Sequence, residues 1–165
     1  MHYLLRFCGI AIAIVALAAE APSAAAQENT FTITCQNVGN GAPEPLADRE
    51  GHSILVNDYS CRADSGPLSG GVWTGRAIWE FDKTNAVLVS GTGVVPKPDA
   101  IAVYQDKLGK LVLTITDGKV SGFASTGQGS YLAAVGSAAS LAGKSYTWME
   151  KSTGPGQFMV EVKVE

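Results

Sequence analysis

The sequence predicts an all-β fold: a small antiparallel up-and-down β-barrel of about eight strands, preceded by a cleaved signal peptide. Three observations predict the barrel. Beyond residue 26, apolar and polar residues alternate in short segments, and none of these segments has the period of a helix. Turn residues separate the segments at roughly 8–12-residue intervals, a spacing shared by barrels and β-sandwiches. Glycines within the segments favour the barrel over the sandwich, because Gly allows the sharp coiling that barrel corners need.

The first 26 residues have the order of parts of a secretory signal peptide. A short, weakly basic start over residues 1–6 precedes an uncharged run over residues 7–19, and residues 24–26 are three alanines that suit a cleavage site. The apolar run is shorter than the about 20 residues that span a bilayer, so an uncleaved anchor is the less favoured alternative. We therefore expect cleavage after Ala26, a single barrel domain over residues 27–165, and a periplasmic or secreted location.

Four strands are expected in the first half of the mature chain. They are, in order, Thr30–Cys35, Ser53–Arg62, Val72–Phe81 and Ala86–Val95. The Pro- and Gly-rich stretch Asn37–Gly51 is expected to be a loop, and residues 82–85 a turn. Pro96 and Pro98 are expected to end the fourth strand, because Pro has no N–H to donate to a strand ladder.

Shorter strands are expected in the second half. They are Ile101–Gln105, Leu111–Thr116, Lys119–Ser125, Gly129–Val135, Lys144–Glu150 and Gln157–Glu165. Asp117-Gly118 is the strongest hairpin signal, because a type I′ turn needs positive φ at both central positions. Residues 138–143 are expected to form a loop or at most one helical turn, and residues 154–156 a tight turn.

Charge and composition argue against some classes of function. The formal net charge is −3, and the sequence contains no basic cluster. Such a chain offers no electrostatic surface for nucleic acid, so none is expected as a partner. Once the leader is removed, the mature form is expected to have no membrane span.

The cysteine count changes when the leader is removed. Of the three Cys, only Cys35 and Cys61 remain. Export to an oxidising compartment makes a Cys35–Cys61 disulfide the natural interpretation, and a pair of reduced, buried thiols is the alternative. Two Cys and one histidine, His52, are too few for a zinc site, so neither a metal nor a cofactor is expected.

Three polar residues are weak catalytic candidates: His52, Arg76 and Glu80. A base or pH-sensing role for His52 is open, but no nucleophile elbow accompanies it, and a surface position at a loop exit is favoured. Arg76 and Glu80 share the less apolar face of the strand Val72–Phe81. In a cavity, Arg76 could hold an anionic or carbonyl group, with Glu80 as its counter-ion or as a base. We expect instead that this face meets solvent or the rim.

The chain also contains many aromatic residues for its size. The candidate ligand-binding residues among them are Trp73, Trp79, Phe81, Tyr131 and Trp148. Core packing is the simpler interpretation of these side chains. The alternative is an aromatic-lined pocket, because an eight-stranded barrel can leave room for one small apolar molecule.

A Gly-rich stretch suggests a family. The sequence GQGSYLAAVG over residues 127–136 resembles the G-x-G-x-[FY]-x-x-A-x-G stretch of the allene oxide cyclase and dirigent barrel group, and residues 91–95 resemble a second Gly-bearing strand of that group. The resemblance implies an eight-stranded antiparallel barrel, often trimeric, whose cavity binds apolar or phenolic molecules and steers cyclisation or radical coupling by shape. It implies a homo-oligomer, but it assigns no catalytic residue to this chain.

Two hypotheses for function follow. The first is an exported barrel that binds a small apolar or aromatic ligand or acts as an envelope interaction module. The alternative is a cofactor-free isomerase or cyclase of the allene oxide cyclase-like type. An enzyme should have an open cavity that holds an ionisable group with a shifted pKa, whereas a structural barrel should be filled by side chains.

Overall fold

The computed structural model describes residues 29–39 and 41–165, so the predicted signal peptide lies outside the described residues. Strands make up most of the described chain, together with one short 3-10 helix, η1. The elements are β1 (Thr30–Val38), β2 (Glu44–Pro45), β3 (His52–Ala63), β4 (Val72–Asp82), β5 (Asn85–Lys97), β6 (Ala100–Thr116), β7 (Lys119–Gly136), η1 (Ala139–Leu141), β8 (Ser145–Gly154) and β9 (Gln157–Val164).

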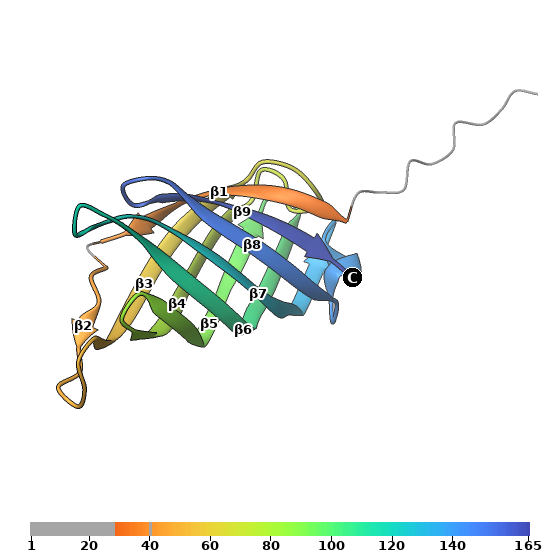
Figure 1. The fold of residues 1–165 in the computed structure, drawn as a ribbon. Helices are drawn as coiled ribbons and strands as arrows, with labels where there is room; N and C mark the ends of the chain where they lie inside the picture. Colours follow the sequence, from red (N-terminus) through yellow and green to blue (C-terminus); the bar gives the residue numbers. More distant parts are fainter. Residues whose placement is uncertain (1–28, 40) are drawn as a thin grey trace, which may run out of the picture.

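Eight of these strands form a closed antiparallel barrel (Figure 1). The sheet order is β1-β9-β8-β7-β6-β5-β4-β3-β2, and β1 also pairs with β3, which closes the barrel. From β3 to β9 each strand lies beside the next one in the chain, as in an up-and-down meander. The predicted fold class is therefore confirmed. The extra strand, β2, pairs with the start of β3 and belongs to a segment, residues 41–51, that we call the arm.

Local turn chemistry sets the hairpins. Asp117 and Gly118 have φ angles of 52° and 73°, so both central positions of the β6–β7 turn are positive, as a type I′ turn requires. Lys83, in the turn between β4 and β5, has a φ of 57°. Both turns lie where the sequence predicted them, because the residues that make them act locally.

Strands β6 and β7 are longer than the sequence predicted. The expected strands Ile101–Gln105 and Leu111–Thr116 are two parts of β6, and Lys119–Ser125 and Gly129–Val135 are two parts of β7. The pairing between β6 and β7 shifts register at three places along its length. Bulges of this kind absorb extra residues without ending a strand, which explains why apparent interruptions in the pattern do not break the ladder.

The prediction that two prolines end the fourth strand was wrong for the first of them. Pro96 lies within β5 opposite Ile101, and the strand ends at Lys97. Pairing between β4 and β5 stops at Val94. Because β4 does not pair with β5 beyond that residue, the missing N–H of Pro96 breaks no hydrogen bond on that side.

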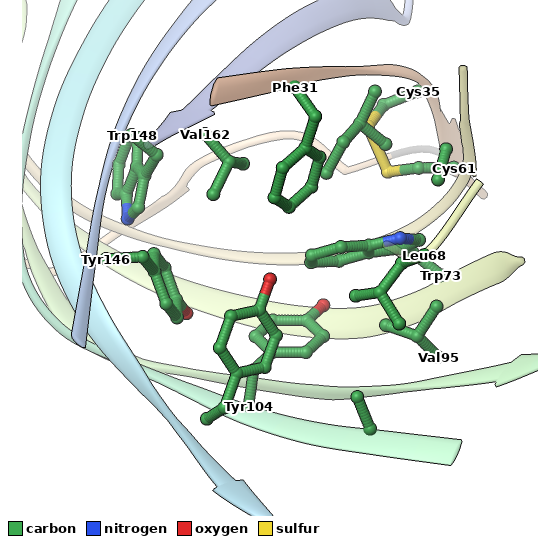
Figure 2. Packing of buried hydrophobic residues seen from close by; sticks show 14 of the residues in the cluster. Phe31, Cys35, Cys61, Leu68, Trp73, Val95, Tyr104, Tyr146, Trp148 and Val162 are labelled. Carbon is green, nitrogen blue, oxygen red and sulfur yellow. A yellow bond between two sulfur atoms is a disulfide. The ribbon is translucent and has the colours of Figure 1, made fainter. Parts of the chain in front are cut away.

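One end of the barrel, which we call the closed end, is tightly packed. The loop of residues 64–71 and η1 both lie there, after β3 and β7 (Figure 1). Leu68 of that loop and Val95 of β5 are both 0% exposed, and they pack beside Trp73 (Figure 2). A Cβ at Gly66 would lie 2.7 Å from the Phe31 Cβ, so the loop backbone rests directly on that ring. Burying side chains of this size stabilises the fold by roughly 2–3 kcal/mol each.

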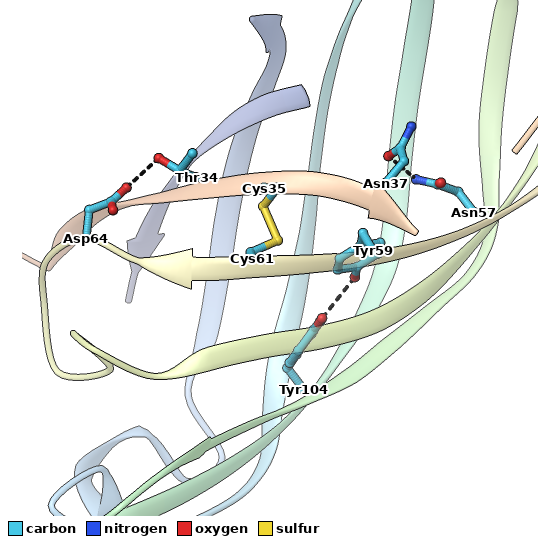
Figure 3. The surroundings of a disulfide bond; sticks show 8 residues. All are labelled: Thr34, Cys35, Asn37, Asn57, Tyr59, Cys61, Asp64 and Tyr104. Atoms are coloured by element: carbon cyan, nitrogen blue, oxygen red, sulfur yellow. Dashed lines mark hydrogen bonds between the residues drawn. A yellow bond between two sulfur atoms is a disulfide. The ribbon is translucent and has the colours of Figure 1, made fainter. Parts of the chain in front are cut away.

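The predicted disulfide joins the two strands that close the barrel. Cys35 of β1 and Cys61 of β3 are directly opposite in the antiparallel register and are bonded (Figure 3). Both cysteines are buried and contribute to the core. The bond closes a chain segment with a sequence separation of 26 that contains the arm. By loop-closure reasoning such a link is worth on the order of 3 kcal/mol.

Candidate functional site

A pocket of about 70 Å³ lies inside the barrel. That is room for several water molecules or one small organic molecule. Much of its wall is aromatic, with Tyr59, Trp73, Trp79, Tyr104, Tyr146 and Trp148 contributed by four different strands. Side chains therefore do not fill the whole interior, as they would in a purely structural barrel.

Glycines in the barrel wall make room for these rings. A Cβ at Gly127 would overlap the Trp148 indole, and a Cβ at Gly129 would overlap the Tyr146 hydroxyl. A Cβ at Gly93 would likewise overlap the Tyr104 hydroxyl. The glycines that the sequence linked to barrel curvature thus have a further role, because without a side chain they let large rings lie close against the wall.

Asp106 is a carboxyl group inside the barrel. It projects from β6 into the pocket, and the Tyr146 hydroxyl donates a hydrogen bond of 2.7 Å to its Oδ1. Burial raises the pKa of Asp106 above its usual range, while the bond from Tyr146 and the nearby Trp148 indole N–H oppose that rise. The structure thus surrounds this acid with donors that stabilise its ionised form.

Glu150 is a second carboxyl group in the same pocket. It projects from β8, and the Ser125 hydroxyl donates a hydrogen bond of 2.5 Å to its Oε2. Burial raises the pKa of Glu150 to about 7, and the nearby charge of Asp106 adds to the rise. Near neutral pH this group can therefore both give up and take up a proton. We call the part of the interior that contains Asp106, Ser125 and Glu150 the polar half.

Two tyrosines meet over the inner face of β4, where Gly75 leaves room for both hydroxyls. The hydroxyls of Tyr59 on β3 and Tyr104 on β6 are 2.9 Å apart and share a hydrogen bond (Figure 3). Burial raises the pKa of both phenols above their usual value, so they stay neutral. This bridge fixes the two rings at the pocket wall.

Some donors in the barrel are unpaired. Within the described residues, the indole N–H groups of Trp73 and Trp148 and the Tyr131 hydroxyl have no hydrogen-bond partner. The two tryptophans are 5% and 7% exposed, and both line the pocket. A buried donor without an acceptor costs free energy, so groups of this kind indicate a place where a further molecule can bind.

The structure separates the five aromatic candidates into two sets. Trp73, Trp79 and Trp148 line the pocket. Phe81 and Tyr131 are buried in the core and do not line it. Tyr131 packs against a ring of the pocket wall, with its ring centroid 5.1 Å from that of Tyr146. A ligand-binding role for these residues stays a prediction.

Arg76 lies on the outside of the barrel, as expected. Its side chain is 59% exposed, and its guanidinium donates to both carboxylate oxygens of Asp58, the residue opposite it on β3. Glu80, the counter-ion of Arg76 in the alternative of a cavity site, instead contacts His52 and Arg49. Residues four apart on one strand are too distant to pair, whereas directly opposite residues of neighbouring strands are close.

His52 is not the surface histidine that the sequence favoured. Its side chain is 8% exposed beneath the arm, where Nδ1 lies 2.5 Å from Asp48 Oδ1 and Nε2 lies 2.8 Å from Glu80 Oε1. These two bonds, the one to Asp48 first, raise the pKa of His52. Its contribution to stability is therefore complete below its ordinary pKa and is lost as the pH rises through the raised value. The sequence pattern missed this burial because the arm folds back over β3.

Sequence reasoning missed Asp106 and Glu150, although a signal for both was present. Tyr146, Trp148 and Glu150 are two residues apart in turn, and so are Tyr104 and Asp106. Alternate residues of a strand share a face, so each acid lies on the face that carries buried rings. An inward-facing acid among aromatic residues is therefore a better indicator of a site than the outward-facing Arg76.

Comparisons with known proteins identify no family. No protein-family model matches the chain, and a search of curated proteins finds no significant relative. In residues 29–39 and 41–165, no group of three or more His, Cys, Asp or Glu side chains is arranged to hold a metal ion. No helix in that same part of the chain is long and apolar enough to cross a membrane.

Proposed function

We propose that this protein is an exported barrel that binds one small, mainly apolar or aromatic molecule in its interior pocket. One observation carries the proposal: a pocket inside the barrel is lined mainly by aromatic and apolar side chains, with a few polar groups among them. An apolar wall with a few polar groups is typical of small-molecule sites. The Cys35–Cys61 disulfide supports export, because such bonds persist in oxidising compartments.

Intrinsic fluorescence gives a direct test, because the sequence has three tryptophans and all of them line the pocket. Protein purified from its native source is extracted, and the extract is analysed by small-molecule mass spectrometry. Compounds recovered in this way are then titrated into ligand-free protein. We expect a saturable change in tryptophan emission at one molecule per barrel.

A pocket-filling variant makes this test specific. Ala77 lines the pocket, so Ala77→Leu should abolish the fluorescence response. Ala133 is exposed on the outside of β7, so Ala133→Leu is the matched control and should respond like the wild type. An equal response in the Ala77→Leu variant would show that the ligand binds elsewhere.

A second candidate function is a cofactor-free isomerase or cyclase of the allene oxide cyclase-like type. The observation that favours it is the presence of two ionisable groups, Asp106 and Glu150, in the pocket. Mass spectrometry separates the two candidates. A compound recovered unchanged after incubation supports binding, and its conversion to an isomer supports the enzyme. The homo-oligomer implied by the resemblance and a role as an envelope interaction module remain predictions.

A further inference from the structure

The pocket is acidic as well as aromatic. Two of its lining side chains, Asp106 and Glu150, are carboxyl groups, and among the described residues no Lys, Arg or His lines it. A neutral ligand would leave both acids without a counter-charge inside the barrel. Burial without a counter-charge favours the protonated form of both acids and raises the pKa of each, whereas a ligand that brings a positive charge would stabilise their ionised forms.

The aromatic wall suits the same kind of ligand. The rings of Trp79 and Trp148 meet edge to face at 89°, with centroids 6.3 Å apart, and both line the pocket. The faces of indole and phenol rings attract cations, most strongly when water is excluded. An aromatic wall beside a carboxyl group therefore accommodates an organic cation better than it does an anion.

Donors beside Asp106 favour its ionised form. The Tyr146 hydroxyl donates to the carboxyl group, and Figure 2 shows Tyr146 next to Trp148. The Trp148 side chain is 7% exposed, and its buried indole N–H has no hydrogen-bond acceptor. The N–H lies near Asp106 and opposes the rise in pKa that burial gives this carboxyl group. A bound cation would complete this arrangement by stabilising the carboxylate that these donors already face.

We propose that the ligand is a small organic ammonium ion whose nitrogen lies between Asp106 and Glu150 and whose apolar part packs against Trp79 and Trp148. This inference rests on the proposed binding function and narrows the chemical class of the ligand. The pocket volume of about 70 Å³ is smaller than the roughly 150 Å³ of a cavity that encloses benzene, so it limits the enclosed apolar part to a short alkyl chain or one edge of a ring.

Binding of such a cation depends on pH in a defined direction. Glu150, with its pKa raised to about 7, is mostly protonated at pH 5 and mostly ionised at pH 8. The other titratable groups that face the two acids are Tyr59 of β3, Tyr104 of β6, and Tyr131 and Tyr146 of β7 and β8. The pKa of each of these phenols is raised, so all four stay neutral over this range. Affinity for an ammonium ion therefore rises between pH 5 and pH 8.

A pair of matched probes tests the charge. Benzylamine, which is protonated over this range, and benzyl alcohol have nearly the same shape and differ in charge. Both are titrated into the full-length mature protein by tryptophan fluorescence at pH 5 and pH 8. We expect benzylammonium to bind about tenfold more tightly at pH 8 than at pH 5, as loss of a charged hydrogen bond would imply. Benzyl alcohol should bind equally at both pH values.

Variants identify the groups responsible. Asp106→Asn and Glu150→Gln keep the side-chain shapes and should each weaken benzylammonium binding at pH 8 by about tenfold or more, with little effect on benzyl alcohol. Glu161→Gln, on the exposed face of β9, is the control and should change neither probe. The wild-type pH comparison tests the inference even if one variant fails to fold.

The possible failures are distinguishable. If benzyl alcohol binds as tightly as benzylammonium at pH 8, the inference is overturned while the proposed binding function stands. If neither probe changes the fluorescence, and the only compounds that co-purify and bind are neutral or anionic, the inference is again overturned. If no compound of any charge binds, both proposals fail.

Discussion

The closed end and the polar half are built from the same strands, but the first is tightly packed and the second borders an unfilled pocket. At the closed end, Leu68 and Val95 are 0% exposed, and a loop and a short helix cover the barrel. In the polar half, the inward-facing residues Ser125, Glu150 and Asp106 hold hydrogen bonds beside an unfilled pocket. A single barrel can therefore use one end for stability and keep the other part of its interior for binding.

The inward-facing side chains change from large and apolar to small or acidic along individual strands. The inward-facing residues of β8 run from Tyr146 through Trp148 to Glu150, and those of β7 from Tyr131 to Ser125. Within a few residues of β8 or β7, large buried rings are thus followed by small or acidic side chains. A strand does not change its path when its side chains change in this way, because the ladder is made by the backbone.

The largest expected effect comes from a pair of phenylalanines, Phe31 at the closed end and Phe123 on β7, two residues from Ser125 of the polar half. Phe31→Ala at the closed end should lower the free energy of unfolding by about 4 kcal/mol, because a fully buried ring leaves a cavity. Phe123→Ala should cost about 2 kcal/mol, since Phe123 is only half-buried and loses less contact. Urea denaturation at pH 7 measures both. Equal losses would show that the two regions are packed alike.

The second prediction is a gain in stability, whereas the two phenylalanine substitutions lower it. Glu150 has a pKa of about 7 in the fold against an ordinary value of 4.5, so its ionisation destabilises the fold as the pH rises between these values. Glu150→Gln should therefore be more stable than the wild type by about 3 kcal/mol at pH 8 and equally stable below pH 4. The exposed control Glu161→Gln should show no such dependence. A Glu150→Gln protein less stable than the wild type at pH 8 would contradict the assignment of a strained, buried acid.

The smallest effect concerns the wall between the regions. Gly127→Ala should lower the free energy of unfolding by about 2 kcal/mol, because the new Cβ would overlap the Leu108 carbonyl oxygen and displace the Trp148 ring. It should also shift the tryptophan emission. At Gly154 the nearest atom to an added Cβ is the Gln157 Oε1 at 3.6 Å, so Gly154→Ala is the matched control and should be close to neutral. An unchanged emission spectrum in Gly127→Ala would show that the indole does not depend on that glycine.

Much of the fold was predictable from residues near each other in the chain. The type I′ turn at Asp117-Gly118 and the alternation of Phe158, Val160, Val162 and Val164 depend only on local preferences. The strand limits in β6 and β7 were less predictable, because a bulge between Asp106 and Leu108 shifts the alternation. For the site, the three tryptophans of the pocket were among the candidates, whereas Asp106 and Glu150 were not.

Short-range chemistry thus decides that this chain forms strands and where it turns. Three-dimensional packing decides the rest. The pairing of β1 with β3, the burial of His52 under the arm and the raised pKa of Glu150 all depend on residues far apart in the sequence. Burial, charge interaction and pocket shape are properties of neighbours in space, so they exist only once the barrel has closed.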